Sequence, residues 1–246
     1  SQTLANLRTV LGIVFLTDED AMDREGMAVE EELCNPHQAR VNMRYDPGIT
    51  PRQARQHFIR AKTLICNEQV LQESVQYEGF FNTVPDMDGI IRRTPLFMAR
   101  SVDYSIFSDA ELANLDPADF IFSEDYYYSL SLANLLQALE LFNGKKPEVW
   151  LKNNLDGVEY LRLDQAIIKL DRKSNILIHF RGPGKTFPYI SASDILNKTL
   201  DPDKLKNKII FVGTSSPGLK DLRSTVFDTA MPGVEVHATV VDNILM

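Results

Sequence analysis

The sequence has 246 residues, of which 44% are hydrophobic and 24% are charged, and it contains 12 Gly and 12 Pro. These values are typical of a globular protein and exclude collagen-like, disordered and disulfide-rich small proteins. The formal net charge is −8, which argues against a nucleic-acid-binding protein, because such proteins usually carry a basic stripe for the phosphates. We expect a single domain over residues 1–246, large enough to bury a sizeable core.

The first residues predict a helix at Ser1–Val10 that runs directly into an apolar strand at Leu11–Leu16. No apolar run approaches the ~18 residues of a membrane-spanning helix. No basic start followed by an apolar stretch marks a signal peptide. We therefore expect a soluble chain that was cut from a longer protein.

A polar stretch follows at residues 17–60, and no apolar period dominates it. Ala21–Leu33 and Pro51–Ala61 could be helical, and we interpret the stretch as an insertion of unclear role that is mobile or faces a partner. The chain has two cysteines, Cys34 and Cys66. Two interpretations of them stay open, namely buried free thiols or, in an exported protein, a disulfide.

A turn motif at Pro85–Gly89 separates two apolar runs within residues 78–98. Asp side chains satisfy turn amides and Gly89 can adopt a positive φ, so the block predicts a β-hairpin. The order Asp86-x-Asp88-Gly also matches the start of a calcium loop. No further ligands follow at the required offsets, so we favour the turn and expect no metal site.

The middle of the chain predicts one long helix and several strands. Apolar residues at helical spacing within residues 123–144 predict a core helix that ends at Gly144. A second hairpin is expected from Val149–Leu155 and Val158–Leu163, and a strand is expected at Asn175–Phe180. The remaining short elements are an apolar run at Gln165–Leu170 and a helix that begins at Ser191 or Ser193.

The C-terminal third predicts an open α/β arrangement. A fully apolar strand at Ile209–Val212 runs into a Gly/Thr/Ser turn at residues 213–218, and Gly233–Met246 has the apolar spacing of a helix. A buried parallel strand followed by a turn and a helix is typical of such folds. We therefore expect an α/β fold with an open mixed sheet flanked by helices and with β-hairpin additions.

Ligands of open α/β sheets bind beyond the carboxyl ends of the strands. The turn after Val212 places hydroxyl groups and free backbone N–H groups at such an end. Charged and polar residues follow closely enough in sequence to fold over this turn. The candidate ligand-binding residues are Arg181, Thr214, Ser215, Asp221, Arg223, Glu235 and His237.

Three interpretations of this corner stay open. Ser215 or Ser216 could be a nucleophile with His237 as its base, although the order G-T-S-S-P is not the G-x-S-x-G of a nucleophile elbow. The turn amides, together with Arg223 and Arg181, could bind a small anionic or polar ligand. Alternatively, Asp221 pairs with Arg223 to hold the long loop, and His237 is a buried packing residue. No nucleotide-binding or zinc-protease motif occurs.

Four blocks of the sequence follow recognisable family patterns in the correct order. Residues 80–96 read F-F-N-T-V-P-D-M-D-G-I-I-R-R-T-P-L, and they are similar to the pattern F-N-x-x-P-D-x-D-G-x-x-R-R-x-P-L of the type-2 CHASE domain. The blocks that resemble further patterns of that family are 175–194, 206–223 and 231–238. The resemblance extends over residues 11–16 and 76–246.

This resemblance implies an extracellular or periplasmic sensory domain of a bacterial membrane receptor. It implies a membrane helix before the domain, further membrane helices after it, and a cytoplasmic output such as a nucleotide cyclase or a histidine kinase. We expect a homodimer that responds to an unknown small-molecule signal, without a cofactor, a bound nucleic acid or catalytic residues. The alternatives are a serine-hydrolase-like enzyme and an interaction module without a ligand.

The sequence departs from the family pattern in two places. The family usually has a strand–helix region before the strand at Leu11, so we expect the N-terminal part of the family domain to be absent. The polar stretch at residues 17–60 matches no motif of the family.

Overall fold

The computed structural model describes residues 8–16, 37–50, 53–54, 56–61, 63–100, 125–214 and 221–246. The chain divides into two compact units that are interleaved in sequence. Unit 1 comprises Ser1–Asn82 and Pro95–Ile176, and unit 2 comprises Thr83–Thr94 and Leu177–Met246. Most of the expected N-terminal helix, the expected helix at Ala21–Leu33, and Cys34 lie outside the described residues. The expectation of a single domain stays a prediction.

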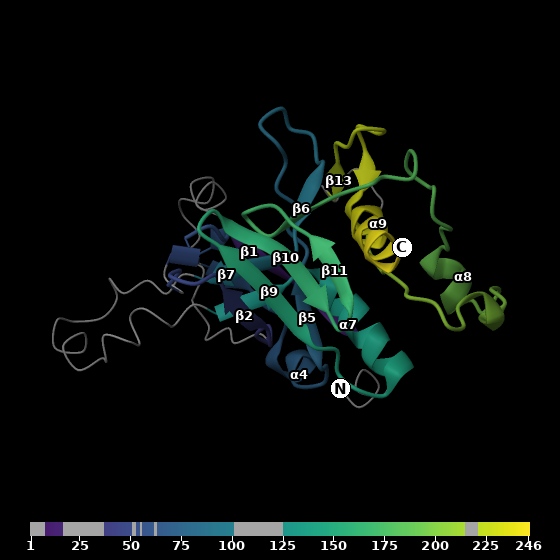
Figure 1. Cartoon of the computed structure of the whole chain (residues 1–246). Coiled ribbons are helices and arrows are strands. Elements are labelled where there is room, and N and C mark those ends of the chain that lie inside the picture. Colours follow the sequence, from purple (N-terminus) through teal and green to yellow (C-terminus); the bar gives the residue numbers. More distant parts are fainter. Residues whose placement is uncertain are drawn as a thin grey trace. The chain divides into compact units, whose positions relative to one another are not determined.

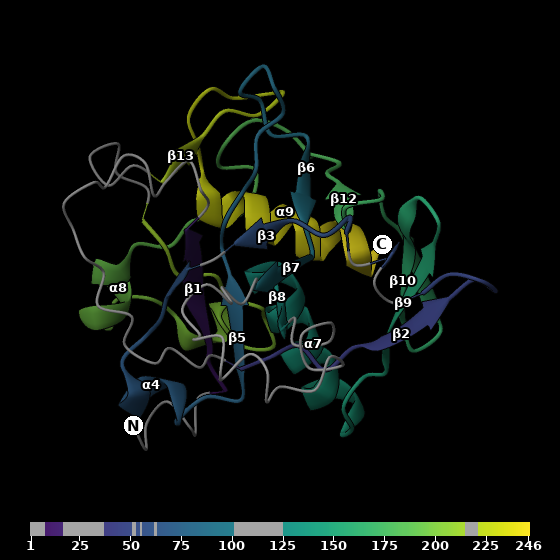
Figure 2. The ribbon, with the colours of Figure 1, turned by 90° about the vertical axis from the view of Figure 1, so that its left-hand side faces the viewer.

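The central strand of unit 1 is β1 (Val10–Leu16), which confirms the apolar strand expected there. It lies between β4 (Thr63–Ile65), which is antiparallel to it, and β5 (Tyr77–Phe80), which is parallel to it. Figure 2 shows β1 beside β5. The side-chain amide of Asn82 extends this pairing, because it donates to the backbone carbonyl of Phe15 at 2.7 Å and accepts from the Phe15 N–H at 2.8 Å.

The core of unit 1 is aromatic. The Phe15 ring packs edge-on against Phe80, with 5.7 Å between ring centroids, and against Tyr127 at 5.4 Å. All three side chains are at most 1% exposed. Such pairs add about 1 kcal/mol each beyond the apolar area that they bury. Unit 1 also contains a three-stranded sheet in the order β3-β7-β8, formed by β3 (Arg60–Ala61), β7 (Phe97–Arg100) and β8 (Asp125–Tyr128). The short helix α4 (Gln69–Gln72) follows β4 along the chain.

The expected long helix is α7 (Leu130–Asn143), and it packs against β1 and β5. Ser129 caps its first turn by accepting from the Leu132 N–H, and Gly144 ends it in the left-handed region at φ +68°. Leu132 and Leu136 are buried as the apolar spacing predicts, whereas Phe142 at the end of the stripe is 86% exposed.

The second hairpin is confirmed as β9 (Val149–Asn154) and β10 (Gly157–Leu163). These strands form a four-stranded sheet in the order β11-β10-β9-β2, with β11 (Ala166–Lys169) at one edge (Figure 1). The other edge is β2 (Asn42–Tyr45), parallel to β9. The polar stretch therefore contributes a strand. The expected helix at Pro51–Ala61 is wrong in its last part, because β3 occupies Arg60–Ala61.

The turn at Pro85–Gly89 is confirmed, but the hairpin around it is wrong. The Gly89 N–H donates to the Asp86 carbonyl at 2.8 Å, and Gly89 has φ +79°. The strands before and after the turn do not pair with each other, since β5 pairs with β1 while β6 (Arg93–Pro95) pairs with β12 (Asn175–Leu177). A turn motif specifies the local backbone, whereas strand pairing depends on distant partners.

Unit 2 has short elements and one long helix. The elements are α8 (Ala192–Leu196), capped by Ser191 as expected, η2 (Pro202–Lys204), β13 (Leu222–Arg223), β14 (Met231–Pro232) and α9 (Gly233–Leu245). β13 and β14 pair antiparallel, and β14 continues directly into α9. The predicted C-terminal helix is confirmed, and Val236 and Val240 on its apolar face are at most 1% exposed.

The buried strand predicted at Ile209–Val212 is wrong. These residues form no strand in the structure, and Val212 is 91% exposed. A continuously apolar strand is stable only when strands flank it and both its faces are covered, and no described strand pairs with this segment. The backbone of Gly213 instead lies against the Val234 side chain at the start of α9.

The coarse fold class is nevertheless confirmed. The described residues form a mixed α/β structure with several small sheets, both parallel and antiparallel, and with helices. The expected single open sheet is wrong, because the described strands do not join into one sheet. The described strands fall into separate sheets of two to four strands. Most of these strands are shorter than five residues, so each offers few backbone hydrogen bonds to a further strand.

Candidate functional site

The predicted corner lies at the N-terminal end of α9. Asp221 precedes β13, and its backbone carbonyl accepts a 2.8 Å hydrogen bond from the N–H of Gly233, the first residue of the helix. Its carboxylate pairs with Arg223 at 3.3 Å. Burial raises the pKa of Asp221 above its ordinary value, and the charge of Arg223 opposes that rise. The pairing is the one that the packing interpretation expects.

Arg223, which lies in β13, also forms a hydrogen bond to the segment just before the Pro85–Gly89 turn. Its Nε donates to the Thr83 hydroxyl at 2.9 Å. The neighbouring backbone adds a second link, because the Ile91 N–H donates to the Ser224 carbonyl at 2.8 Å. The guanidinium group of Arg223 is thus bonded to both Asp221 and Thr83.

Glu235 is buried in the first turn of α9, with 2% exposure. Its carboxylate accepts from the backbone N–H groups of Lys185, Thr186 and Phe187 at 2.8, 2.9 and 3.3 Å. The Tyr189 hydroxyl donates to it at 2.6 Å. Burial and the adjacent carboxylate raise the pKa of Tyr189. A buried carboxylate with four donors is satisfied, and Glu235 fastens the 184–189 loop to the helix.

His237 is 3% exposed, and its ring stacks on Phe211 with 6.5 Å between centroids. The His237 ring is therefore buried within unit 2, on the face of α9 that meets Phe211. Ser215 and Ser216 lie outside the described residues, so the hydrolase geometry is untested. Thr214 is described and is exposed.

Arg181 lies at the opposite end of α9 from the predicted corner. Its guanidinium forms two hydrogen bonds with Asp242, at 2.5 and 2.9 Å. At 1.5 Å per residue, Asp242 stands about 13 Å along the helix axis from Gly233. The structure therefore brings Asp221, Arg223 and Glu235 to one end of the helix and Arg181 to the other. Ligand binding by these residues stays a prediction.

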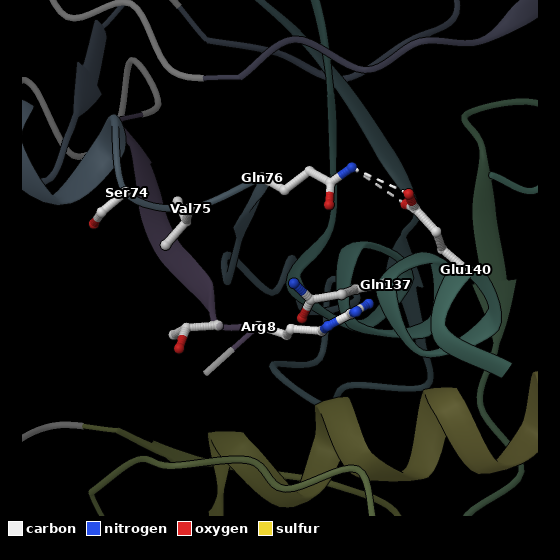
Figure 3. Close-up of a pocket in the computed structure, with 7 residues that line it drawn as sticks. Arg8, Ser74, Val75, Gln76, Gln137 and Glu140 are labelled. Atoms are coloured by element: carbon white, nitrogen blue, oxygen red, sulfur yellow. Dashed lines mark hydrogen bonds between the residues drawn. The ribbon is translucent and has the colours of Figure 1, made fainter. Parts of the chain in front are cut away.

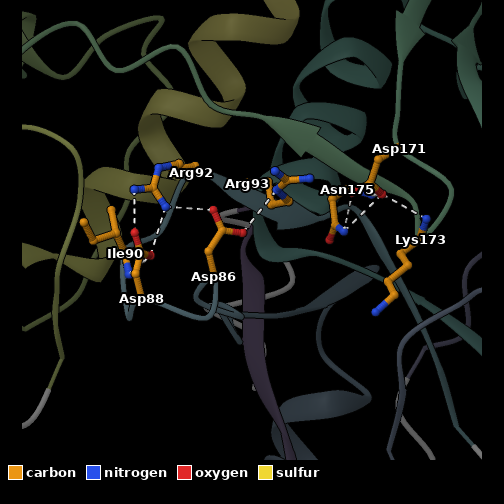
Figure 4. Close-up of polar contacts among 8 residues, drawn as sticks. All are labelled: Asp86, Asp88, Ile90, Arg92, Arg93, Asp171, Lys173 and Asn175. Atoms are coloured by element: carbon orange, nitrogen blue, oxygen red, sulfur yellow. Dashed lines mark hydrogen bonds and ion pairs between the residues drawn. The ribbon is translucent and has the colours of Figure 1, made fainter.

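The turn motif forms a compact charge cluster in unit 2 (Figure 4). Arg92 bonds to Asp88 at 2.7 Å and to Asp86 at 3.0 Å, and Arg93 reaches Asp86 at 3.3 Å. The arginine hydrogen bonds lower the pKa of Asp88 to about 2. The carboxylates are neutralised by arginine, so the cluster offers no net charge to Ca²⁺. Among the described residues, no group of acidic, His or Cys side chains is arranged to hold a metal ion.

A cavity in unit 1 was missed by the sequence analysis. It has a volume of about 380 Å³ and lies where β1 and β5 begin, beside the last turns of α7 (Figure 3). Its lining residues are Arg8, Thr9, Ser74, Val75, Gln76, Gln137 and Glu140. The only sequence signal was the presence of polar residues on a helix with an apolar stripe, which is also the pattern of an ordinary solvated face.

The Cys66 side chain is partly buried against the aromatic core of unit 1. It takes part in a disulfide in the structure, and the chain has one other cysteine, Cys34. Because Cys34 lies outside the described residues, their pairing stays a proposal.

The comparisons with known proteins identify the family. The family model of the CHASE2 domain matches residues 8–246. The chain therefore belongs to the CHASE2 family, a family of extracellular sensory domains. No curated protein and no solved structure matches the chain. The predicted absence of an N-terminal part is not confirmed, because the match begins at residue 8.

This membership has two direct consequences. The chain is a signal-sensing domain, and since the family is sensory rather than catalytic, the domain is not an enzyme by itself. No helix among the described residues is long and apolar enough to cross a membrane.

Proposed function

We propose that this domain lies on the periplasmic or extracellular side of a bacterial cytoplasmic membrane, as the input domain of a transmembrane receptor. Membrane helices would connect it to a cytoplasmic nucleotide cyclase or histidine kinase, and the receptor would work as a homodimer. Family membership supports the sensory part of this proposal. The arrangement of unit 2 supports the transmission part.

The observation that carries the proposal is that loops of unit 2 are hydrogen-bonded to α9 near both of its ends. Glu235 holds the 184–189 loop to the first turn. In the last turns, Asp242 holds Arg181, and the Asn243 side chain exchanges hydrogen bonds of 2.8 and 3.1 Å with the backbone of His179. A change in these loops therefore acts on the helix. A ligand that favours one arrangement would shift its population and so bias the output.

The test uses the full-length parent protein in membranes. Asp242→Asn removes the ion pair with Arg181. Exposed ion pairs contribute little to stability, so the fold is kept while the last turn of α9 is loosened. We expect a severalfold change in the cyclisation of ATP or GTP, or in phosphate transfer from ATP. Asp203→Asn changes an exposed carboxylate of the same unit and should leave the output unchanged.

Two results would overturn the proposal. One is a parent protein without cyclase or kinase activity. The other is an output that stays the same when the whole sensory domain is deleted.

A further inference from the structure

The cavity of unit 1 contains polar groups that have no partner within the described part of the chain. Gln137 is 8% exposed, and among the described residues its side-chain amide has no hydrogen-bond partner. The guanidinium of Arg8 likewise forms no ion pair with the described part of the chain. Figure 3 shows both side chains among those that line the cavity. The Gln137 amide atoms are not sealed from solvent, and Arg8 is exposed, so both groups are open to a ligand that enters the cavity.

The other side of the cavity carries negative charge. Glu140 accepts from the Gln76 amide at 3.2 Å and from the Tyr77 hydroxyl at 2.9 Å. These donors fix the carboxylate without neutralising it. Burial, together with this carboxylate, raises the pKa of Tyr77, so the phenol stays a donor. The C-terminal end of α7 adds partial negative charge of its own.

The two charged residues, Arg8 and Glu140, belong to separate elements of unit 1. Arg8 precedes β1 and has φ +51°, an uncommon value for a residue other than glycine. Glu140 stands on α7, and no ion pair joins it to Arg8. A cation and an anion that line one cavity without contacting each other leave room for a ligand that carries both charges.

We propose that this cavity binds a small zwitterion that bears a carboxylate and an ammonium group, such as a free amino acid. Arg8 and the Gln137 amide bind the carboxylate, and Glu140 binds the ammonium group. The volume of about 380 Å³ lies within the usual range of small-molecule sites. Glu140 repels a simple anion and Arg8 repels a simple cation, so each half of the ligand alone binds poorly.

This inference names the signal of the proposed receptor, and it rests on the proposed function only for the consequence of binding. Binding itself is measured on the purified 246-residue chain by calorimetry with the free L-amino acids. The amino acid that binds best is then compared with its analogue that lacks the α-amino group and with the amine that lacks the carboxylate. We expect each analogue to bind about tenfold more weakly or worse.

Variants identify the site. Arg8→Ala and Glu140→Gln should each weaken binding by about tenfold or more. Arg172→Ala removes an exposed arginine of the same unit and should bind as the native chain does. Gln137→Leu separates a binding role from a structural one. It should weaken binding without lowering the unfolding temperature, because the Gln137 amide makes no hydrogen bond with the described part of the chain.

The inference is overturned if no amino acid binds, or if the deaminated analogue binds as tightly as the amino acid, which would make the site a plain anion site. Equal loss of binding in Arg172→Ala and Arg8→Ala would also contradict it. These outcomes leave the receptor proposal standing, because that proposal is tested by the output of the parent protein in membranes.

Discussion

Glu235 shows how one residue is fixed by its surroundings. It is the first acidic residue of α9, where the partial positive charge of the helix N-terminus favours a carboxylate. Three backbone N–H groups from one loop converge on it. The backbone of that loop therefore depends on a single buried charge, and its loss would leave several donors unsatisfied.

Replacing this carboxylate should be costly. Glu235→Gln keeps the shape but removes the charge and turns one acceptor into a donor, so we expect the free energy of unfolding to fall by about 2–4 kcal/mol. Urea unfolding at neutral pH measures this. Asp203→Asn should change it by less than about 0.5 kcal/mol. A similar small loss in both variants would show that the loop is not held by Glu235.

Two aspartates in unit 2 should give opposite pH dependences. The pKa of Asp221 is raised by burial, so its stabilising contribution is complete below the ordinary pKa of 3.8 and is lost as the pH rises through the raised value. The pKa of Asp88 is lowered to about 2, so its contribution is present above 3.8 and is lost as the pH falls toward 2.

These signs predict the behaviour of two variants. Relative to the native chain, Asp221→Asn should gain stability as the pH rises from about 3 to about 7, and Asp88→Asn should lose stability over the same range. Urea unfolding at several pH values measures both differences. Parallel profiles for Asp221→Asn and the native chain would contradict the effect assigned to burial.

Features that depend on neighbouring residues, such as turns and helix caps, could be predicted from the sequence. Contacts between residues that are far apart in the sequence could not. The Asp86 turn and the Ser191 cap depend on neighbouring residues and could be inferred from sequence. Arg8 and Gln137 line one cavity from distant parts of the sequence, and nothing in their sequence surroundings marks them. Arg181 was expected beside Asp221, but their separation along α9 depends on which helical turn each residue contacts.

At the scale of elements, the close approach of β5 to α7 depends on one glycine. A Cβ on Gly79 would lie 2.6 Å from the Cα of Leu130, in the first turn of the helix. Backbone atoms cannot move aside as the end of a side chain can, so only glycine allows this contact. The same contact positions α7 beside the proposed cavity.

Gly79→Ala should therefore lower the free energy of unfolding by about 3 kcal/mol. Gly12 is a matched control, because it is the register partner of Gly79 in β1. A Cβ on Gly12 would meet the ring of the half-exposed Phe81 at 2.9 Å, and that ring can rotate. We expect the loss in Gly12→Ala to be clearly smaller in thermal and urea unfolding, and equal losses would contradict this account.

The elements that could be predicted are those whose signal is local. α7 and α9 have apolar periods with caps, and β9 and β10 have an Asp-Gly turn between them. The hairpin expected around Pro85–Gly89 failed because strand partners are chosen over long sequence distances. The strand at Ile209–Val212 failed for the same reason, since apolar composition does not show whether neighbouring strands are available.

At the scale of the whole molecule, the cysteines bear on the compartment. Structural disulfides persist in oxidising compartments and are rare in the cytosol. We expect the purified chain to contain a Cys34–Cys66 disulfide, found by mass spectrometry of unreduced peptides. Breaking it with Cys34→Ser should cost about 3–4 kcal/mol, because it closes a loop of roughly 30 residues. Two titratable thiols in protein purified without reductant would contradict this.

The central claim, that the domain faces the outside of the membrane, is tested most directly by labelling the full-length parent protein in intact cells. Met87 stands fully exposed at the tip of the turn, so Met87→Cys offers an accessible thiol without disturbing the core, and the native protein gives the background. A membrane-impermeant maleimide should label Met87→Cys in intact cells, or in spheroplasts where an outer membrane is present. Labelling that occurs only after the cells are lysed would place the domain in the cytoplasm and contradict the account.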